Sequence, residues 1–311
     1  MKLSIIVPIY GVECYIIDFA KSLFPQLDER VELILINDGT KDESFIKIKK
    51  FYQEYYLNKL NVIFLEQENQ GQSVARNFGI KICKGDYVTF LDPDDIVASN
   101  YILKIMPALN NNPDMIQFNA KVFSKDISNF ENYIILAKDT EFINVNKKNI
   151  INIYKKNFWF SWLRVTKREF LTDNFFPKKV NYQDMMAFPQ IYKSINTIQN
   201  LEEFLVYYRV HQSSSVNIFS PKLIKSADYG LKMYEGCNDS FDQLIYQQFI
   251  DLRFNLTITS SGLLFAYKWY YFDIYKNKYS KYYSSVLKLV FTFLKFFVIL
   301  IYRNFKQKIG L

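Results

Sequence analysis

Three carboxylates fall within four residues of one another, at Asp92, Asp94 and Asp95, directly after the apolar run VTFL. Carboxylates this close repel one another, so they are costly to hold together unless a cation lies among them. A D-x-D pair at the exposed end of a buried strand can hold Mg²⁺ or Mn²⁺ against a diphosphate, whose oxygens complete an octahedral site. The alternative is a solvated acidic turn that caps a helix starting near Ile96, since aspartate is a good N-cap.

Apolar runs and helical patterns alternate through the first third of the chain. The runs show little in-out alternation, which is typical of strands buried on both faces of a parallel sheet, and they cover 4–10, 31–37, 61–67 and 86–92. Helical patterns lie between them at 13–27, 42–57 and 70–82, and Thr40 and Glu43 have the spacing of a capping box for the second. This alternation predicts a doubly wound α/β domain.

Polar residues stand at three of the predicted strand ends. Tyr10 follows the first strand, Asp38 follows the second, and the acidic cluster follows the fourth. In a doubly wound fold the carboxyl ends of the strands meet at one edge, where ligands bind. We therefore expect these side chains to converge on one crevice.

Beyond residue 113 the pattern is looser. We expect a strand at 115–123, a helix at 146–158, a strand at 204–211 and helical structure from about 221 onward. A boundary near 218 then separates a catalytic domain, 1–218, from a helical C-terminal region, 219–311. Within the catalytic domain we expect a nucleotide-sugar half at about 1–112 and an acceptor half at about 113–218.

Four motifs resemble those of glycosyltransferase family two, a group of inverting enzymes with the GT-A fold. They are VPIYG (7–11), INDGTKD (36–42), ENQGQSVARNFGI (68–80) and FLDPDD (90–95). Four motifs in this order, at the right strand ends, are far more specific than any one of them. Neither a G-x-G-x-x-G after the first strand nor a G-x-x-x-x-G-K-[ST] motif occurs, which argues against dinucleotide and P-loop sites. The resemblance implies a GT-A fold: a Rossmann-like, mostly parallel sheet with helices on both faces.

The resemblance also implies a nucleotide site. Pro8 and Tyr10 lie where the family holds the nucleobase, and the ring of Tyr10 can stack on uracil. Asp38 stands where a carboxylate accepts the N3–H of the base, which favours uracil over cytosine. Arg76 would lie near the diphosphate or the base; the alternative is a solvated arginine on the helix surface.

Sugar and metal contacts follow from the same resemblance. Asp92 would contact the ribose or the sugar, and Asp94 would bind Mn²⁺ or Mg²⁺ directly. His211 is the single histidine of the sequence and precedes a serine-rich segment, like the family's basic segment that closes over the diphosphate. That position suits a metal ligand or a phosphate contact, although a lone histidine is more often structural.

The acceptor side is predicted from two further segments. NYQDMMAFPQIY (181–192) resembles the family's Glu-Asp motif, with Gln183 in place of the glutamate and Asp184 retained. Inverting transfer needs one base that takes the acceptor's proton, and Asp184 is the predicted base, or else an N-cap for a helix at 184–194. FWFSWLRVTKREF (158–170) resembles the family's W-x-K-L segment, so Trp162 is predicted to stack on an acceptor sugar, or else to pack in the core.

The whole net charge of +8 lies in the C-terminal tail. Residues 266–311 include nine basic residues and one acidic residue, so the charges of residues 1–265 sum to zero. A charge confined to the tail argues against nucleic acid as a partner.

The segment 286–308 has a narrow polar stripe with two lysines opposite a wide apolar face, which predicts a helix at a membrane surface. Docking on 221–280, or on a second subunit of a homo-oligomer, is the alternative.

The sequence as a whole predicts an enzyme. The apolar run at residues 4–10 is broken by Pro8 and no cleavage site follows, so we expect a first strand rather than a signal peptide. The catalytic part is then cytoplasmic and peripheral at the inner face of the cell membrane. The predicted reaction transfers a hexose or N-acetylhexosamine from a UDP-sugar to a lipid-linked saccharide acceptor. We expect this transfer to be a step in bacterial surface-polysaccharide synthesis. The alternative is a binding protein of the same fold that has lost transfer, for which Gln183 is the one indication.

Overall fold

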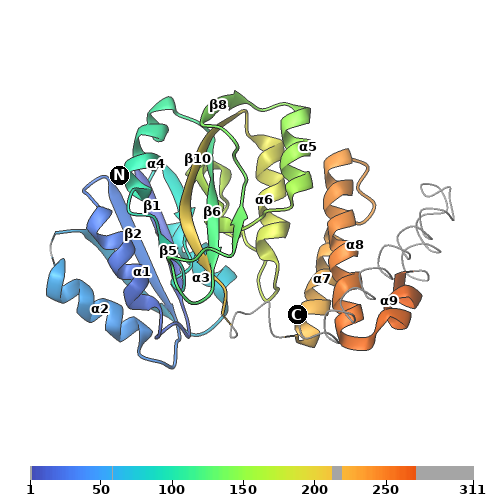
Figure 1. The fold of residues 1–311 in the computed structure, drawn as a ribbon, viewed down its shortest axis with the longest axis horizontal. Helices are drawn as coiled ribbons and strands as arrows, with labels where there is room; N and C mark the ends of the chain where they lie inside the picture. The colour runs from blue at the N-terminus through green and yellow to red at the C-terminus, as the bar shows by residue number, and fades with distance from the viewer. Residues whose placement is uncertain (1, 58, 212–218, 271–311) are drawn as a thin grey trace. The chain divides into compact units, whose positions relative to one another are not determined.

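The computed structural model of the chain describes residues 2–57, 59–211 and 219–270. The chain divides into two compact units, Met1–Phe249 and Ile250–Leu311. The first unit is a large mixed sheet flanked by helices (Figure 1).

The sheet has ten strands in the described residues: β1 (Leu3–Ile9), β2 (Val31–Asp38), β3 (Asn61–Gln67), β4 (Tyr87–Phe90), β5 (Ile96–Val97), β6 (Met115–Phe123), β7 (Asn132–Ile134), β8 (Glu141–Asn144), β9 (Arg164–Lys167) and β10 (Thr197–Arg209). Their order is β3-β2-β1-β4-β9-β6-β10-β5, with β7 beside β6 and β8 beside β10. Strands β1 to β4 are mutually parallel, β9 pairs antiparallel with β4 and β6, and β6 is parallel to β10. The long strands therefore run in one direction, and their carboxyl ends share one edge.

The described helices are α1 (Ile16–Leu23), α2 (Ser44–Tyr55), α3 (Gln72–Ile82), α4 (Tyr101–Ala108), α5 (Lys147–Lys156), α6 (Gln183–Ser194), α7 (Pro221–Met233), α8 (Ser240–Ser261) and α9 (Leu263–Trp269). Helices α2 and α3 lie on opposite faces of the sheet. Phe45 of α2 packs edge-on against Phe64 of β3, which pairs with Leu35, whereas Gly79 of α3 lies against Ile36. Adjacent residues of a strand point to opposite faces, so the sheet is covered on both sides.

Burial on both faces explains the uninterrupted apolar runs. Every residue of β1 and β2 is buried, as predicted for strands inside a parallel sheet. Helix α3 approaches this sheet so closely that a Cβ at Gly79 would lie 2.5 Å from Cγ2 of Ile6. Glycine is therefore required there for helix-to-sheet packing. The predicted α/β fold class is confirmed.

Two local predictions were wrong. Thr40 and Glu43 form no capping box, because α2 begins at Ser44 and the hydroxyl of Thr40 bonds Asp42 instead. No helix starts at Ile96, where the chain forms the short strand β5 against β10. The acidic cluster therefore does not cap a helix at that point; it forms a turn in which the amide of Asp95 donates to the carbonyl of Asp92 at 3.2 Å.

The end of the first unit is helical and packs on α6. The hydroxyl of Ser226 on α7 accepts a hydrogen bond from the backbone of Asn181 at 2.9 Å. Lys193 of α6 forms ion pairs with Asp239 and Asp242, each at 2.9 Å. The helical character predicted from about 221 onward is thus observed as far as the description extends.

The described residues contain no helix that is long and apolar enough to cross a membrane. In the second unit they comprise the last part of α8 and α9. The predicted tail helix at 286–308 lies outside the described residues.

Candidate active site

The acidic cluster follows β4 and faces the end of β10. The Nε2 of His211 lies 2.9 Å from Oδ2 of Asp94. Two residues earlier, at the last position of β10, Arg209 donates from Nε to the backbone carbonyl of Asp94 at 2.9 Å. The two contacts join the cluster to the end of β10 and to the residues that follow it.

Asp95 is buried, and its carboxylate forms a hydrogen bond with the backbone of β10. Its Oδ1 accepts a hydrogen bond from the amide of Arg209 at 2.8 Å. Burial raises the pKa of Asp95 well above its usual value, and the nearby charges of Asp94 and Asp92 act in the same direction. This residue therefore supports the geometry of the cluster from inside.

Arg76 joins two carboxylates from distant parts of the chain. Its guanidinium is 1 % exposed and lies 2.6 Å from Asp92 through Nη2 and 3.2 Å from Asp184 through Nη1. Partial burial raises the pKa of Asp92 to about 6, although the charge of Arg76 opposes the rise. The alternative of a solvated arginine on a helix surface was wrong: Arg76 is the inner link between the acidic cluster and α6.

Asp184 lies in the first turn of α6 but does not cap it. The N-cap residue is Tyr182, and no side-chain cap bond is present. Instead, Oδ1 of Asp184 faces Arg76 and Oδ2 accepts a hydrogen bond from the amide of Ser161 at 3.0 Å. Each carboxylate oxygen keeps a second lone pair for another donor. The N-cap alternative was therefore wrong, and the carboxylate is held in one orientation toward the site.

A second bridge joins α3 and α6 beside the first. The side chain of Gln183 donates from Nε2 to Oε1 of Gln72 at 2.8 Å. Gln72 in turn donates from its own Nε2 to Oδ1 of Asp92 at 3.0 Å. The glutamine that stands in the place of the family's glutamate thus has a defined partner. Gln72 was not identified from the sequence, because nothing in its surroundings marks it as facing Gln183.

Asp38 organises the loop that leads into α3. Its Oδ1 accepts hydrogen bonds from Nε2 of Gln67 at 2.7 Å and from the amide of Gln70 at 2.9 Å, and its Oδ2 accepts from the amide of Gly71 at 2.9 Å. On the neighbouring strand, Pro8 is buried and Tyr10, just past β1, is 51 % exposed. The predicted nucleobase residues therefore lie on adjacent parallel strands, with one aromatic ring open to solvent.

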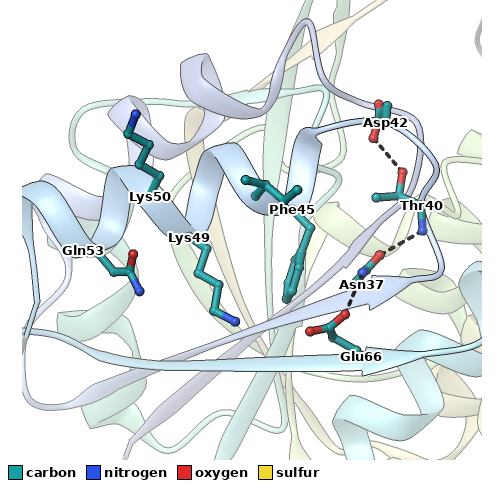
Figure 2. A pocket seen from close by; sticks show the side chains of 9 residues that line it. Asn37, Thr40, Asp42, Phe45, Lys49, Lys50, Gln53 and Glu66 are labelled. Atoms are coloured by element: carbon teal, nitrogen blue, oxygen red, sulfur yellow. Dashed lines mark hydrogen bonds between the residues drawn. The ribbon is translucent and has the colours of Figure 1, made fainter.

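The turn that carries Asp38 is fixed by a chain of polar contacts, shown in Figure 2. Asn37 accepts from the amide of Thr40 at 2.9 Å and donates to Glu66 at 3.3 Å, and Thr40 donates to Asp42 at 2.7 Å. These residues line a hollow of about 480 Å³ beside α2. Its two lysines are balanced by Asp42 and Glu66, and none of the predicted site residues lines it. The hollow is thus distinct from the acidic cluster.

Residues 4–166, more than half of the chain, match the sequence profile of the family described as Glycosyl transferase family 2. The chain belongs to this family.

Known members and structures agree with that assignment. The family 2 chain is 41 % identical over 97 residues to the minor teichoic acid biosynthesis protein GgaB of Bacillus subtilis, which covers 30 % of this chain and 10 % of GgaB. The structure resembles that of S. aureus TarS 1-349 in complex with UDP-GlcNAc, with a TM-score of 0.63. The match covers 84 % of this chain and 74 % of the TarS chain, and the two sequences are 20 % identical. The mannosyltransferase PcManGT of Pyrobaculum calidifontis, in complex with GDP-Man and Mn²⁺, gives a TM-score of 0.55 at 13 % identity over 86 % and 74 % of the two chains. The structural similarities support the GT-A fold.

The spacing of Asp94 and His211 would allow both side chains to bind one divalent cation in place of their direct contact. Two ligands at right angles, each about 2.1 Å from an ion, lie about 3 Å apart. Asp94 and His211 have that separation, 2.9 Å. In the part of the chain that the structure describes, no group of three or more metal-ligating side chains converges. The remaining ligands of an ion at this position would therefore come from the diphosphate and water.

Trp162 is 2 % exposed and packs in the core, which was the alternative to stacking on an acceptor sugar. It stacks on Phe160 with ring centroids 4.9 Å apart, and on Tyr208 at 5.4 Å. Neither Phe160 nor Tyr208 was identified from the sequence. Phe160 stands in the same segment as Trp162, but the partner ring on β10 becomes visible only once the strands are assembled.

Proposed function

We propose that this chain is an inverting glycosyltransferase that moves a hexose or N-acetylhexosamine from a UDP-sugar to a saccharide acceptor. The observation that carries the proposal is the bridge from Asp92 through Arg76 to Asp184. It ties the carboxylate cluster expected to face the donor to the carboxylate expected to face the acceptor. A reaction between donor and acceptor needs both sides fixed in one geometry.

The donor would lie over the carboxyl ends of β1, β2 and β4. Tyr10 offers an exposed ring for uracil, and Oδ2 of Asp38 keeps one lone pair for the N3–H beyond the three bonds that Asp38 makes to its loop. Asp92, held by Arg76, would contact the ribose or the sugar.

Asp94 and His211 would hold Mn²⁺ or Mg²⁺. When bound, such an ion neutralises the charge that develops on the departing diphosphate. The cation bound to PcManGT supports this proposal by example.

The acceptor side would use Asp184 as the base. An acceptor hydroxyl attacks the anomeric carbon as the bond from that carbon to the diphosphate oxygen breaks, and the hydroxyl proton passes to the carboxylate of Asp184. UDP leaves on the opposite face, so the configuration inverts and an α-linked UDP-hexose gives a β-linked product. The bonds from Arg76 and Ser161 aim the carboxylate for this transfer.

The biological setting is proposed from relatives and from the tail. The chain spans 10 % of the length of GgaB and 14 % of that of the S. pneumoniae glycosyltransferase GlyA, so their complete functions do not carry over. The word teichoic acid in the name of GgaB, and the UDP-GlcNAc bound to TarS, support surface-glycan synthesis from a UDP-sugar. Residues 1–218 would form the catalytic domain, and the basic tail of 219–311 would hold it at the inner face of the membrane, near a lipid-linked acceptor.

A thermal-shift panel tests the proposal. Purified protein is heated with UDP-glucose, UDP-galactose, UDP-GlcNAc, UDP-GalNAc or GDP-mannose, with and without Mn²⁺. We expect stabilisation by at least one UDP-sugar that increases with Mn²⁺, and slow hydrolysis of that donor without acceptor. Stabilisation without any hydrolysis or transfer would favour a nucleotide-binding protein that has lost catalysis. No response to any nucleotide would contradict the proposal.

A further inference from the structure

Three aromatic rings pack against one another beside the predicted base. Phe160 and Trp162 are stacked with centroids 4.9 Å apart and planes 15° apart, and Trp162 and Tyr208 are stacked at 5.4 Å and 25°. Phe160 and Tyr208 also touch, at 5.9 Å. Trp162 is buried, whereas Phe160 and Tyr208 are each partly exposed. The surface that this cluster offers to a ligand is therefore made by Phe160 and Tyr208.

A buried arginine fixes the loop that carries Phe160. Arg164 is 1 % exposed and donates from Nη1 to the carbonyl of Phe160 at 2.7 Å and from Nη2 to the carbonyl of Phe158. Its Nε donates to the hydroxyl of Tyr192 at 2.7 Å. With both carbonyls held by one planar group, the loop has little freedom.

Tyr208 is positioned by a strand rather than by a loop. It lies in β10 and pairs with Val122 of β6. Burial raises the pKa of Tyr208 to about 12, and the charges of Asp95, Asp92 and Asp94 add to the rise. A platform that is already ordered loses little conformational entropy when a ligand binds.

The position of the rings ties them to the acceptor. The residue after Phe160 donates its amide to Oδ2 of Asp184 at 3.0 Å. An acceptor hydroxyl that gives its proton to Asp184 must lie against the same carboxylate, so the rest of its sugar lies within reach of Phe160.

The chemistry of the surface favours a ligand with a flat apolar face, such as a sugar ring. The C–H groups on one face of a pyranose carry partial positive charge and pack well on the negative face of an aromatic ring. An acyclic polyol has hydroxyls but no flat apolar face, so it gains little from the platform.

We propose that Phe160 and Tyr208 form a platform that binds the apolar face of a pyranose ring in the acceptor, with Trp162 as its buried support. This inference rests on the proposed function, since it takes Asp184 as the base. It assigns the contact with the sugar to the two rings that reach solvent, and it commits the acceptor to a cyclic sugar at the reacting end.

Saturation-transfer NMR tests the platform without knowledge of the natural acceptor. The probes are the methyl β-pyranosides of glucose, galactose, mannose and N-acetylglucosamine, and acyclic sorbitol, each with UDP present. We expect saturation of the ring C–H protons of at least one pyranoside by the wild-type protein, and none of sorbitol. Phe160→Ala should lower that signal roughly tenfold, whereas Phe160→Trp, which keeps a ring, should retain it.

Tyr133→Ala is the matched control. Tyr133 is 51 % exposed and packs on Phe204, so its removal takes an exposed aromatic ring from another part of the sheet. It should leave the pyranoside signal unchanged. Each variant is accepted for comparison when its melting temperature with UDP matches the wild type, and Phe160→Leu replaces Phe160→Ala if the latter unfolds.

Three results would overturn the platform: no saturation of any pyranoside by the wild type, equal saturation of sorbitol, or an unchanged signal in the Phe160 variant that lacks a ring. Donor hydrolysis separates this failure from that of the proposed function. If the wild type hydrolyses a UDP-sugar but any of the three results is found, the platform alone is wrong. If it neither binds UDP nor hydrolyses a donor, the proposed function fails, and the platform fails with it.

Discussion

The guanidinium of Arg76 lies 3.2 Å from the carboxylate of Asp184, although the two residues are 108 positions apart in the sequence. The other nitrogen of the same group lies 2.6 Å from Asp92. A planar guanidinium holds two carboxylates in a fixed relative orientation, which an ammonium could not do as well. The acceptor-side carboxylate and the donor-side cluster are thereby joined into one unit.

Gln183→Glu should impair this protein, even though it restores the residue that the family usually has. Oε1 of Gln72 accepts from the Gln183 amide, while Nε2 of Gln72 donates to Asp92. A carboxylate at position 183 offers no donor to Oε1 of Gln72, so the present bond between these two side chains is lost and the amide of Gln72 must reorient. It also adds negative charge beside Asp184. We expect transfer to fall by roughly tenfold, the effect of losing one or two hydrogen bonds. The measurement is the steady-state rate of transfer.

The double variant Gln72→Lys/Gln183→Glu is the control for this interpretation. A lysine donates to both carboxylates and should recover part of the lost rate. A single Gln183→Glu protein that is faster than the wild type would show that the bridge to Gln72 has no role.

Asp94→Ala should abolish transfer and make UDP binding insensitive to Mn²⁺. Removing one of three crowded carboxylates relieves repulsion, so the melting temperature should not fall. His211→Ala should weaken the response to Mn²⁺ less severely, since Asp94 remains. Thermal shifts with UDP, with and without Mn²⁺, measure both effects.

Asp28→Asn removes a partly exposed carboxylate that pairs with Arg30 and serves as the control. It should behave as the wild type. An Asp94→Ala protein that transfers sugar at a normal rate in the presence of a chelator would rule out the metal site.

The order of strands and helices in the first third of the chain could be predicted, because buried parallel strands leave uninterrupted apolar runs in the sequence. The meeting of Tyr10, Asp38 and the acidic cluster at one edge followed from the shared direction of those strands. The link between Arg76 and Asp184 could not be predicted in the same way. It depends on how α6 packs against α3, and no local pattern encodes a contact across 108 residues.

Two further features of the site could not be predicted from the sequence, because each depends on a contact with a distant part of the chain. Aspartates before a helical pattern favour an N-cap, yet the chain after Asp95 forms β5, because the carboxylate is used by the backbone of Arg209. The amide that Ser161 gives to Asp184 depends on a loop held by the buried Arg164. A hydrogen bond donated by a backbone amide does not depend on the type of the side chain, so it cannot be recognised from the sequence.

Asp114→Asn should destabilise the catalytic fold in a pH-dependent way. Burial alone would raise the pKa of Asp114, but hydrogen bonds from the amides of Asn196 and Thr197 and from Lys167 lower it below its usual value. The ionised form is therefore preferred in the folded state, and its stabilisation is present above the unfolded pKa of about 3.9. It is lost as pH falls through the lower folded pKa.

Urea unfolding of the wild type and of Asp114→Asn at several pH values measures this effect. We expect a difference in unfolding free energy of about 1–3 kcal/mol at pH 6 to 7, shrinking toward pH 3. A difference that is constant or grows on acidification would contradict the assignment. UDP binding by the variant should match that of the wild type.

The tail should bind anionic membranes. All of the net charge lies in 266–311, next to a segment with a lysine stripe and a wide apolar face. Each basic residue near an anionic surface contributes about 1 kcal/mol, which salt screens, whereas burial of the apolar face does not depend on salt in that way. Flotation with phosphatidylglycerol vesicles should therefore show binding that weakens, without vanishing, as salt rises.

Truncation after Ser284 is the matched variant for this test. It should release the protein from vesicles and leave donor hydrolysis intact, since every predicted site residue precedes residue 212. A full-length protein that never floats, together with a truncated one that loses its donor site or a dimer, would assign the tail to packing.

Asp184→Asn tests the central claim most directly. The substitution keeps the size of the side chain and an oxygen that can accept a bond from Arg76 or from the amide of Ser161, and it removes the ability to take a proton. Transfer from a radiolabelled UDP-sugar to a glycoside that the wild-type protein accepts should fall by about 10²–10⁴-fold, with unchanged affinity for the UDP-sugar. The melting temperature should fall only slightly, because one of the two bonds to the carboxylate is lost. Transfer at the wild-type rate would contradict the role of Asp184 as the base, and loss of UDP-sugar affinity in a folded variant would place this carboxylate in the donor pocket instead.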